Sequence, residues 1–148
     1  MQTIEKSVEV GVPLSRAYNQ WTQFEEFPKF MEGVEQVRQL DDRHLHWVAE
    51  IAGKREEWDA EILEQVPDQR IAWRSTSGAR NAGVVSFQPV GRSRTRVDLR
   101  LTYEPEGVTE KVGDFIGVVS RRVENDLERF KDFIQTQGRE TGGWRGSI

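Results

Sequence analysis

The chain has 148 residues, the size of a single domain, and a net charge of −4 in which 25 acidic side chains are interspersed with 21 basic ones. This balance leaves no basic field for a nucleic-acid backbone, so we exclude nucleic acid as a partner. The absence of cysteine excludes disulfides, thiolate chemistry and cysteine metal sites. No apolar run approaches the roughly 18 residues of a membrane-spanning helix, and the first residues lack a signal-peptide pattern, so we expect a cytoplasmic protein without stable membrane insertion.

The first third of the chain predicts one strand and two short helices. Residues 2–11 alternate as a strand that ends at Gly11, and Pro13 suits the first turn of a helix because its φ is fixed. The next apolar residues, up to Trp21, are spaced for one helix face. A second helical segment follows around Phe24, Phe27 and Phe30, and Pro28 interrupts it.

Six further strands are predicted between the second short helix and residue 104. The turn sequences Asp41-Asp42, Gly53, Pro67-Asp68, Ser77-Gly78 and Gly91 separate them. Such short connections favour an antiparallel meander. Apolar and charged residues alternate with period two, so one face is covered and the other is exposed. The positions expected to face inward are Leu45, Trp47, Ala49, Ile51, Trp58, Ala60, Ile62, Ile71, Trp73, Val85, Phe87, Val97, Leu99, Leu101 and Tyr103.

Residues 108–137 predict one long amphipathic helix, because their apolar residues recur every three or four positions. At 1.5 Å per residue this helix is about 45 Å long, so it must lie across the whole sheet. Its charged residues, among them Arg121, Arg122, Glu124, Glu128, Arg129 and Lys131, are assigned to the solvated outer face. We expect residues 1–138 to form the domain and residues 139–148 to form a flexible tail.

The order of the predicted elements, together with specific residues within them, resembles that of a known family. These are Ser7-Val8-Glu9-Val10 before Val12-Pro13, Trp21-Thr22, Phe27-Pro28-Lys29-Phe30-Met31, Trp58, and Val66-Pro67-Asp68 before Ile71-Ala72-Trp73. The chain is similar to the START and birch-pollen-allergen-like helix-grip superfamily, in particular its small bacterial polyketide cyclase/dehydrase-like proteins. The resemblance implies an α+β helix-grip fold, in which a curved seven-stranded antiparallel sheet wraps around a long C-terminal helix and two short helices follow the first strand.

The inward positions and the short helices carry an unusually aromatic set of side chains. Aromatic walls suit flat or apolar ligands, and the resemblance implies a cavity between sheet and helix. The alternative is that these side chains are simply core. The candidate ligand-binding residues are Trp21, Phe24, Phe30, Met31, Trp47, Trp58, Trp73, Phe87, Tyr103, Phe115 and Val119.

Few polar residues are expected to face this cavity: Lys54, Glu56, Ser75, Asn81 and Tyr103. Glu56 lies two residues from Trp58, so its pKa could be raised for acid–base work, although a solvated carboxylate explains it as well. Tyr103 could orient a ligand carbonyl or merely cap the sheet edge. His44 and His46 share one strand face and could hold a metal, but an exposed polar face explains them equally. We expect no metal and no cofactor.

The sequence therefore favours a non-enzymatic domain that binds or carries a small hydrophobic, aromatic or lipid-like ligand between sheet and helix. One alternative is a polyketide cyclase or dehydratase that uses Glu56 and Tyr103. Another is a protein-interaction module without a ligand, for which Trp144 and Arg145 in the tail are candidate contacts. A monomer and a homodimer are both compatible with the sequence.

Overall fold

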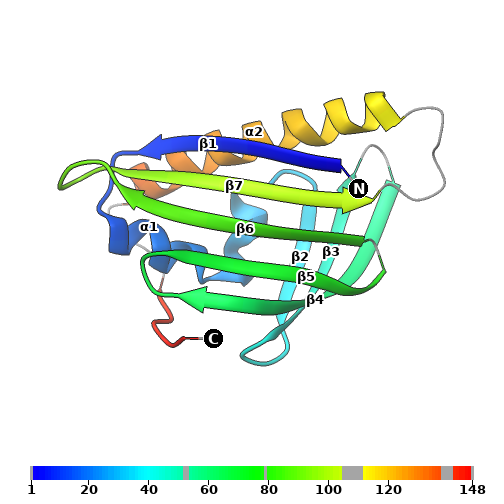
Figure 1. Ribbon diagram of the computed structural model, residues 1–148, viewed down its shortest axis with the longest axis horizontal. Coiled ribbons are helices and arrows are strands. Elements are labelled where there is room, and N and C mark those ends of the chain that lie inside the picture. Colours follow the sequence, from blue (N-terminus) through cyan, green and yellow to red (C-terminus); the bar gives the residue numbers. More distant parts are fainter. Residues whose placement is uncertain (1, 52–53, 79, 105–111, 138–141, 148) are drawn as a thin grey trace.

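A computed structural model describes residues 2–51, 54–78, 80–104, 112–137 and 142–147, without the side chains of residues 2, 51, 104 and 112–116. One seven-stranded sheet and one long helix dominate it (Figure 1). The elements are β1 (Gln2–Val10), α1 (Leu14–Trp21), the 3-10 helix η1 (Phe24–Lys29), β2 (Val34–Gln39), β3 (His44–Ile51), β4 (Lys54–Val66), β5 (Arg70–Gly78), β6 (Arg80–Pro89), β7 (Thr95–Glu104) and α2 (Val112–Thr136). No helix in these residues is long and apolar enough to cross a membrane.

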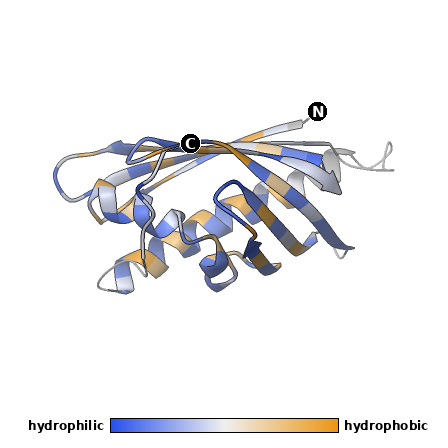
Figure 2. Ribbon diagram, turned by 90° about the horizontal axis from the view of Figure 1, so that it is seen from below, coloured by the Kyte–Doolittle hydropathy of each residue, from blue (hydrophilic) through white to orange (hydrophobic). Residues whose placement is uncertain are grey.

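The sheet has the strand order β1-β7-β6-β5-β4-β3-β2, and every neighbouring pair is antiparallel. Strands β2 to β7 therefore form the predicted meander, and β1 pairs with β7 at one edge. The sheet curls over α2, and η1 and α1 close the same side (Figure 2). This arrangement confirms the predicted helix-grip architecture.

The predicted boundaries differ from the observed ones by a few residues. Strand β1 ends at Val10, and the carbonyl of Pro13 accepts the N–H groups of Arg16 and Ala17, so the proline precedes the first turn of α1 instead of lying within it. Pro28 lies inside η1 and does not break it, because a 3-10 helix this short needs few N–H donors. The long helix is described from Val112 onward, and the first predicted positions, 108–111, lie outside the described residues.

The predicted inner face of the sheet is the covered face. Of the described inward positions, most are buried, and Trp47, Trp73, Leu99 and Leu101 pack partly buried against them. The pairing register between β4 and β5 shifts at two places, between Asp59 and Ala60 and between Ile62 and Glu64, and the second shift leaves Leu63 as an extra residue in β4. This bulge reverses the alternation of inward and outward side chains that follows it. Leu63 is therefore exposed, and the side chain of Gln65 points into the core.

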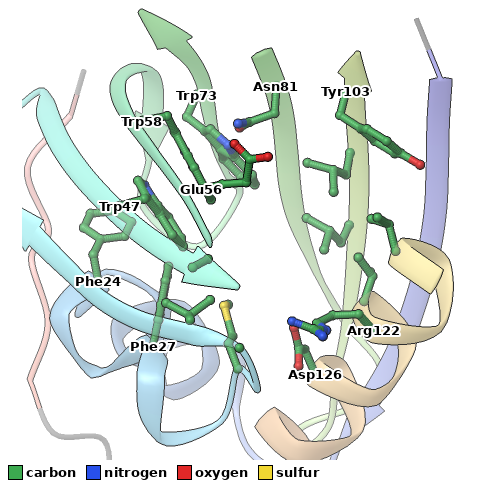
Figure 3. A pocket seen from close by; sticks show the side chains of 18 of the residues that line it. Phe24, Phe27, Trp47, Glu56, Trp58, Trp73, Asn81, Tyr103, Arg122 and Asp126 are labelled. Atoms are coloured by element: carbon green, nitrogen blue, oxygen red, sulfur yellow. The ribbon is translucent and has the colours of Figure 1, made fainter. Parts of the chain in front are cut away.

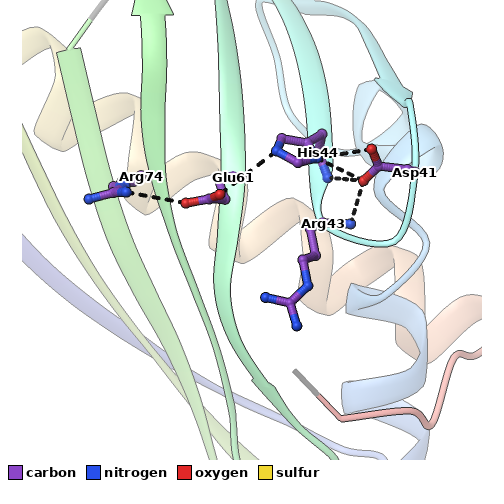
Figure 4. Close-up of polar contacts among 5 residues, drawn as sticks. All are labelled: Asp41, Arg43, His44, Glu61 and Arg74. Carbon is purple, nitrogen blue, oxygen red and sulfur yellow. Dashed lines mark hydrogen bonds and ion pairs between the residues drawn. The ribbon is translucent and has the colours of Figure 1, made fainter.

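The outer face of the sheet carries charged ladders across β3, β4 and β5. His44 contacts Asp41 at 2.9 Å and Glu61 at 3.7 Å, and Glu61 in turn pairs with Arg74 (Figure 4). His46 contacts Asp59 at 2.7 Å. Each histidine is thus occupied by carboxylates of its own face, and no three His, Asp or Glu side chains of the described residues are grouped as a metal site.

Residues 142–147 lie against α1. The guanidinium of Arg145 donates to both carboxylate oxygens of Asp68, at 2.8 and 2.9 Å, and to Asn19 at 2.8 Å. The backbone N–H of Trp144 donates to the Thr22 hydroxyl at 3.0 Å. These contacts fasten part of the segment that the sequence predicts to be flexible, while residues 138–141 lie outside the described part of the chain.

Candidate functional site

A cavity of about 210 Å³ lies between the curled sheet and α2 (Figure 3). Apolar side chains from the short helices, from the inner face of the sheet and from α2 supply most of its wall. The lining residues are Trp21, Phe24, Phe27, Met31, Glu32, Gly33, Val34, Leu45, Trp47, Ala49, Glu56, Trp58, Ile62, Ile71, Trp73, Arg80, Asn81, Leu99, Leu101, Tyr103, Val118, Val119, Arg122, Val123, Asp126 and Leu127.

Tryptophans of three adjacent strands form one wall of this cavity. Trp47 and Trp58 face each other directly in the β3–β4 pairing, and their rings stack with centroids 5.6 Å apart and an interplanar angle of 10°. Phe27 of η1 packs on Trp47 with centroids 5.5 Å apart. These rigid rings present broad apolar surfaces with little rotamer freedom to lose when a ligand binds.

A glycine makes room for the third indole. Trp73 faces Gly83 in the β5–β6 pairing, and a Cβ added at Gly83 would lie 2.5 Å from Cζ2 of Trp73. Any larger residue at position 83 would push this ring out of its place on the sheet. The indole N–H groups of Trp47 and Trp58 are buried and have no acceptor among the described residues.

A polar corner interrupts the apolar lining where α2 meets the start of β2. The backbone N–H of Glu32 donates to Oδ1 of Asp126 at 3.1 Å. The guanidinium of Arg122 donates to the carbonyl oxygens of Glu32, at 3.2 Å, and Glu50, at 2.5 Å. Figure 3 shows Arg122 and Asp126 next to each other on α2, across the cavity from the tryptophans. These contacts fasten α2 to the β2 and β3 edge of the sheet.

Gly33 permits this close approach. Its φ is +87°, a conformation that residues with a Cβ rarely adopt. A Cβ there would collide with the guanidinium of Arg122 and the carbonyl oxygen of Glu50. A glycine is therefore required at position 33 for the polar corner to close.

Among the described residues that line the cavity, Asp126 has the carboxyl group with the most strongly shifted pKa. Burial raises its pKa from 3.8 to about 7, because the charged form loses hydration, while the Glu32 N–H and the nearby Arg122 and Arg129 oppose part of this shift. The carboxyl group therefore exists in both protonation states near neutral pH. It can donate a hydrogen bond in one state and only accept in the other.

Residues 10–132 match the family described as polyketide cyclase/dehydrase and lipid transport. The chain belongs to this family. It is 53% identical over its whole length to an uncharacterized 17.2 kDa protein from the melC2-rnhH intergenic region of Streptomyces lincolnensis, and the match covers 99% of that protein.

Solved structures of the same fold extend the comparison. The Zhui aromatase/cyclase from Streptomyces sp. R1128 superposes with a TM-score of 0.80 at 16% identity, covering 97% of this chain and 99% of that one. A START superfamily protein from Mycobacterium smegmatis superposes with a TM-score of 0.75 at 16% identity, covering 89% and 98%. At these identities the likeness shows the helix-grip fold and leaves the activity open.

Most of the sequence-predicted ligand-binding residues of this family member do line the cavity: Trp21, Phe24, Met31, Trp47, Trp58, Trp73, Tyr103 and Val119. Phe30 and Phe87 do not. Phe30 packs against Phe130 of α2, and Phe87 packs against Tyr18 of α1. The side chain of Phe115 lies outside the described residues.

The candidate catalytic residues Glu56 and Tyr103 also line the cavity, together with Asn81. Glu56 is half-buried and pairs with Lys54 at 3.5 Å. Burial raises the pKa of the Tyr103 hydroxyl above its ordinary value. Lys54 is exposed, and the Ser75 hydroxyl accepts the backbone N–H of Asn81 instead of facing the cavity.

The polar corner is not predicted by the sequence pattern. The pattern places Arg122 on the solvated face of the long helix, and this prediction is wrong, because Arg122 and Asp126 both line the cavity. Their spacing contained the signal: they lie three and seven positions after Val119, on the same stripe as Val123 and Leu127. Glu32 and Gly33 take part through their backbone, which no side-chain pattern reveals.

Proposed function

We propose that this protein binds a small hydrophobic or aromatic molecule in the cavity between the sheet and α2, and sequesters or carries it without changing it. The observation that supports this proposal most directly is the almost entirely apolar wall of the cavity. This wall is formed by the stacked rings of Trp47 and Trp58, by Trp73 and by the short helices. Pockets of this composition are typical of small-molecule sites. Lipid transport within the family description supports a binding role.

Ligand binding is tested with the purified protein and a panel of fused-ring aromatics and medium-chain fatty acids. Native mass spectrometry reports bound species, quenching of tryptophan fluorescence reports affinity, and the melting temperature reports stabilisation. A ligand at a hundred times its dissociation constant should stabilise the protein by about 2.7 kcal/mol. If no panel member is retained, quenches fluorescence or shifts the melting temperature, the proposal fails.

A cavity-filling variant locates the site. Val123 lines the cavity from α2, so Val123→Phe should place a ring in the empty volume and abolish binding while the protein remains folded. Asn125→Phe introduces the same ring at an exposed position of the same helix and serves as the matched control. Equal ligand affinity in the two variants would place binding elsewhere.

A second candidate function is an enzyme that closes or dehydrates a polyketide-like ring. One observation favours it: a carboxyl group with a pKa near 7 faces the cavity at Asp126, as general acid–base catalysis requires. Incubation with a reactive poly-β-ketone thioester, followed by mass analysis of the products, tests this function. Turnover that disappears in Asp126→Asn or Glu56→Gln would establish it, and a product distribution identical to that without protein would exclude it.

A further inference from the structure

The size of the cavity restricts what can occupy it. A buried apolar cavity of about 150 Å³ holds one benzene molecule, whereas sites for drug-sized ligands begin at about 300 Å³. With about 210 Å³, this cavity suits one substituted ring or two fused rings. The flat indole faces of Trp47 and Trp58 match such a ring better than a flexible chain.

The polar corner restricts where the ligand carries its polar group. Oδ1 of Asp126 accepts the N–H of Glu32, and Oδ2 has no hydrogen-bond or ion-pair partner among the described residues. Arg122 already donates to two backbone carbonyl oxygens. Both of these bonds come from Nη1 of Arg122, so Nε and Nη2 of its guanidinium remain as donors at this corner. Among the described residues, the acceptor that remains open here is Oδ2 of Asp126.

Charge restricts the ligand further. Arg122 and Arg129 of α2 and Glu32 of the adjoining segment surround the Asp126 carboxyl, and Glu56 and Arg80 are the other charged groups among the described residues of the cavity wall. A ligand carboxylate at this corner would meet the Asp126 carboxyl as well as the Arg122 guanidinium, while Arg129 and Glu32 are paired with each other at 3.0 Å. In the part of the wall that the structure describes, positive and negative groups thus nearly balance, which favours an uncharged ligand.

We propose that the ligand is an uncharged aromatic alcohol of one or two rings, whose hydroxyl group hydrogen-bonds to Oδ2 of Asp126 while its rings lie against the tryptophan wall. This inference rests on the proposed binding function and names the ligand class. A hydroxyl group fits Asp126 in either protonation state, because it accepts from the carboxylic acid and donates to the carboxylate. With a pKa of about 7, Asp126 adopts both states near neutral pH.

A cycle of two ligands and two proteins tests this proposal. The dissociation constants of 2-naphthol and naphthalene, which differ only in the hydroxyl group, are measured for the unaltered protein and for Asp126→Ala. We expect the unaltered protein to prefer 2-naphthol by about tenfold, as one buried hydrogen bond provides, and Asp126→Ala to lose this preference. Glu128→Ala, at an exposed position of the same helix, should keep it.

Asp126→Asn provides a second measurement, the affinity for a ligand that can only accept a hydrogen bond. A purely structural role of Asp126 would not change this affinity relative to that of naphthalene. If its Oδ1 keeps the Glu32 bond, the amide only donates toward the ligand. 2-Methoxynaphthalene only accepts, so at pH 8.5, where the Asp126 carboxyl is ionised, its affinity relative to naphthalene should be higher in Asp126→Asn than in the unaltered protein. The reverse order would overturn the assignment of Asp126, and this variant keeps the side-chain shape if Asp126→Ala fails to fold.

The possible failures are distinguishable. If naphthalene and 2-naphthol bind equally well, or if Asp126→Ala keeps the preference, the hydroxyl assignment is wrong and the proposed binding function stands. If laurate binds more tightly than both, the ligand class is a lipid and the inference is overturned. If none of these compounds binds, the inference and the proposed function fall together.

Discussion

The two halves of the space between the sheet and α2 differ in how they are filled. Toward the end of α2, Phe130 and Ile134 are fully buried, and the Phe130 ring lies 4.9 Å from that of Trp21 and 5.2 Å from that of Phe30. Nearer its start, α2 presents Val119 and Val123 toward the tryptophans of the sheet. Near the end of α2, large rings from both the helix and the opposite layer fill the space. Near its start, the short β-branched side chains of α2 lie opposite large rings, and the cavity remains between them.

Because of this difference, one part of α2 contributes mainly to the stability of the fold and the other part mainly to ligand binding. The filled half gains close-packed contacts among its aromatic rings, which are worth more than area burial alone. The hollow half gives up part of that packing, and it also contains a carboxyl group whose ionised form is poorly hydrated. We therefore expect substitutions in the filled half to change folding strongly and substitutions in the hollow half to change mainly ligand binding and pH dependence.

The largest expected effect is that of Phe130→Ala. This substitution removes a fully buried ring from a cluster with Trp21 and Phe30, so it should lower the free energy of unfolding by about 3–5 kcal/mol. Urea unfolding followed by circular dichroism measures the loss. Val119→Ala in the hollow half is the matched comparison and should cost about 1–2 kcal/mol, because its removed methyl groups already border a cavity. Equal losses would show that the two halves are packed alike.

The next effect is a dependence of stability on pH that originates at Asp126. Its pKa is about 7 in the folded protein and near 3.8 when unfolded, so the folded state binds the proton more tightly. The stability that this group contributes is therefore complete below about pH 4 and is lost as the pH rises to about 7. A shift of about three units corresponds to roughly 2–4 kcal/mol after allowance for partial solvation.

Comparison with Asp126→Asn isolates this contribution. The variant should be more stable than the unaltered protein at pH 8, and the difference should shrink as the pH falls toward 4. The pKa values of Asp59 and Asp68 are lowered, by hydrogen bonds from His46 and Ser77 and from Arg145 respectively, so these groups lose their contribution at still lower pH and cancel in the difference. A pH-independent difference between the two proteins would contradict the assignment.

The sequence predicts the fold and one wall of the cavity, but it does not distinguish the residues that line the cavity from those that fill the core. Alternation in the strands and the three-and-four spacing of the helix predict the fold, because both record which face is covered. The same patterns predict the tryptophan wall at Trp47, Trp58 and Trp73. They could not separate lining residues from core, since Phe30 and Phe87 have the same pattern and differ only in what packs against them.

The polar corner escaped prediction for a different reason. Charged residues on an amphipathic helix usually face solvent, so the pattern predicts an outward Arg122 and gives no role to Asp126, although both fall on the apolar stripe. Their partners are backbone groups of Glu32 and Glu50, beside Gly33, whose φ is positive and where a Cβ would collide with Arg122. Residue periodicity contains no information on that contact.

The smallest expected effect belongs to residues 142–147, which contact α1 and the β4–β5 turn and are not among the residues that line the cavity. Arg145 pairs with Asp68 through two hydrogen bonds and lies 5.6 Å from the ring centre of Tyr18, but about half of its side chain is exposed. Arg145→Ala should therefore lower stability by less than about 1 kcal/mol, leave ligand affinity unchanged, and increase hydrogen exchange at the Trp144 backbone amide. Arg92→Ala, at an exposed position of the β6–β7 turn, is the control. Unchanged exchange at Trp144 would show that the Arg145–Asp68 pair does not hold the tail, and the segment would then be free to contact a partner, as the interaction-module alternative requires.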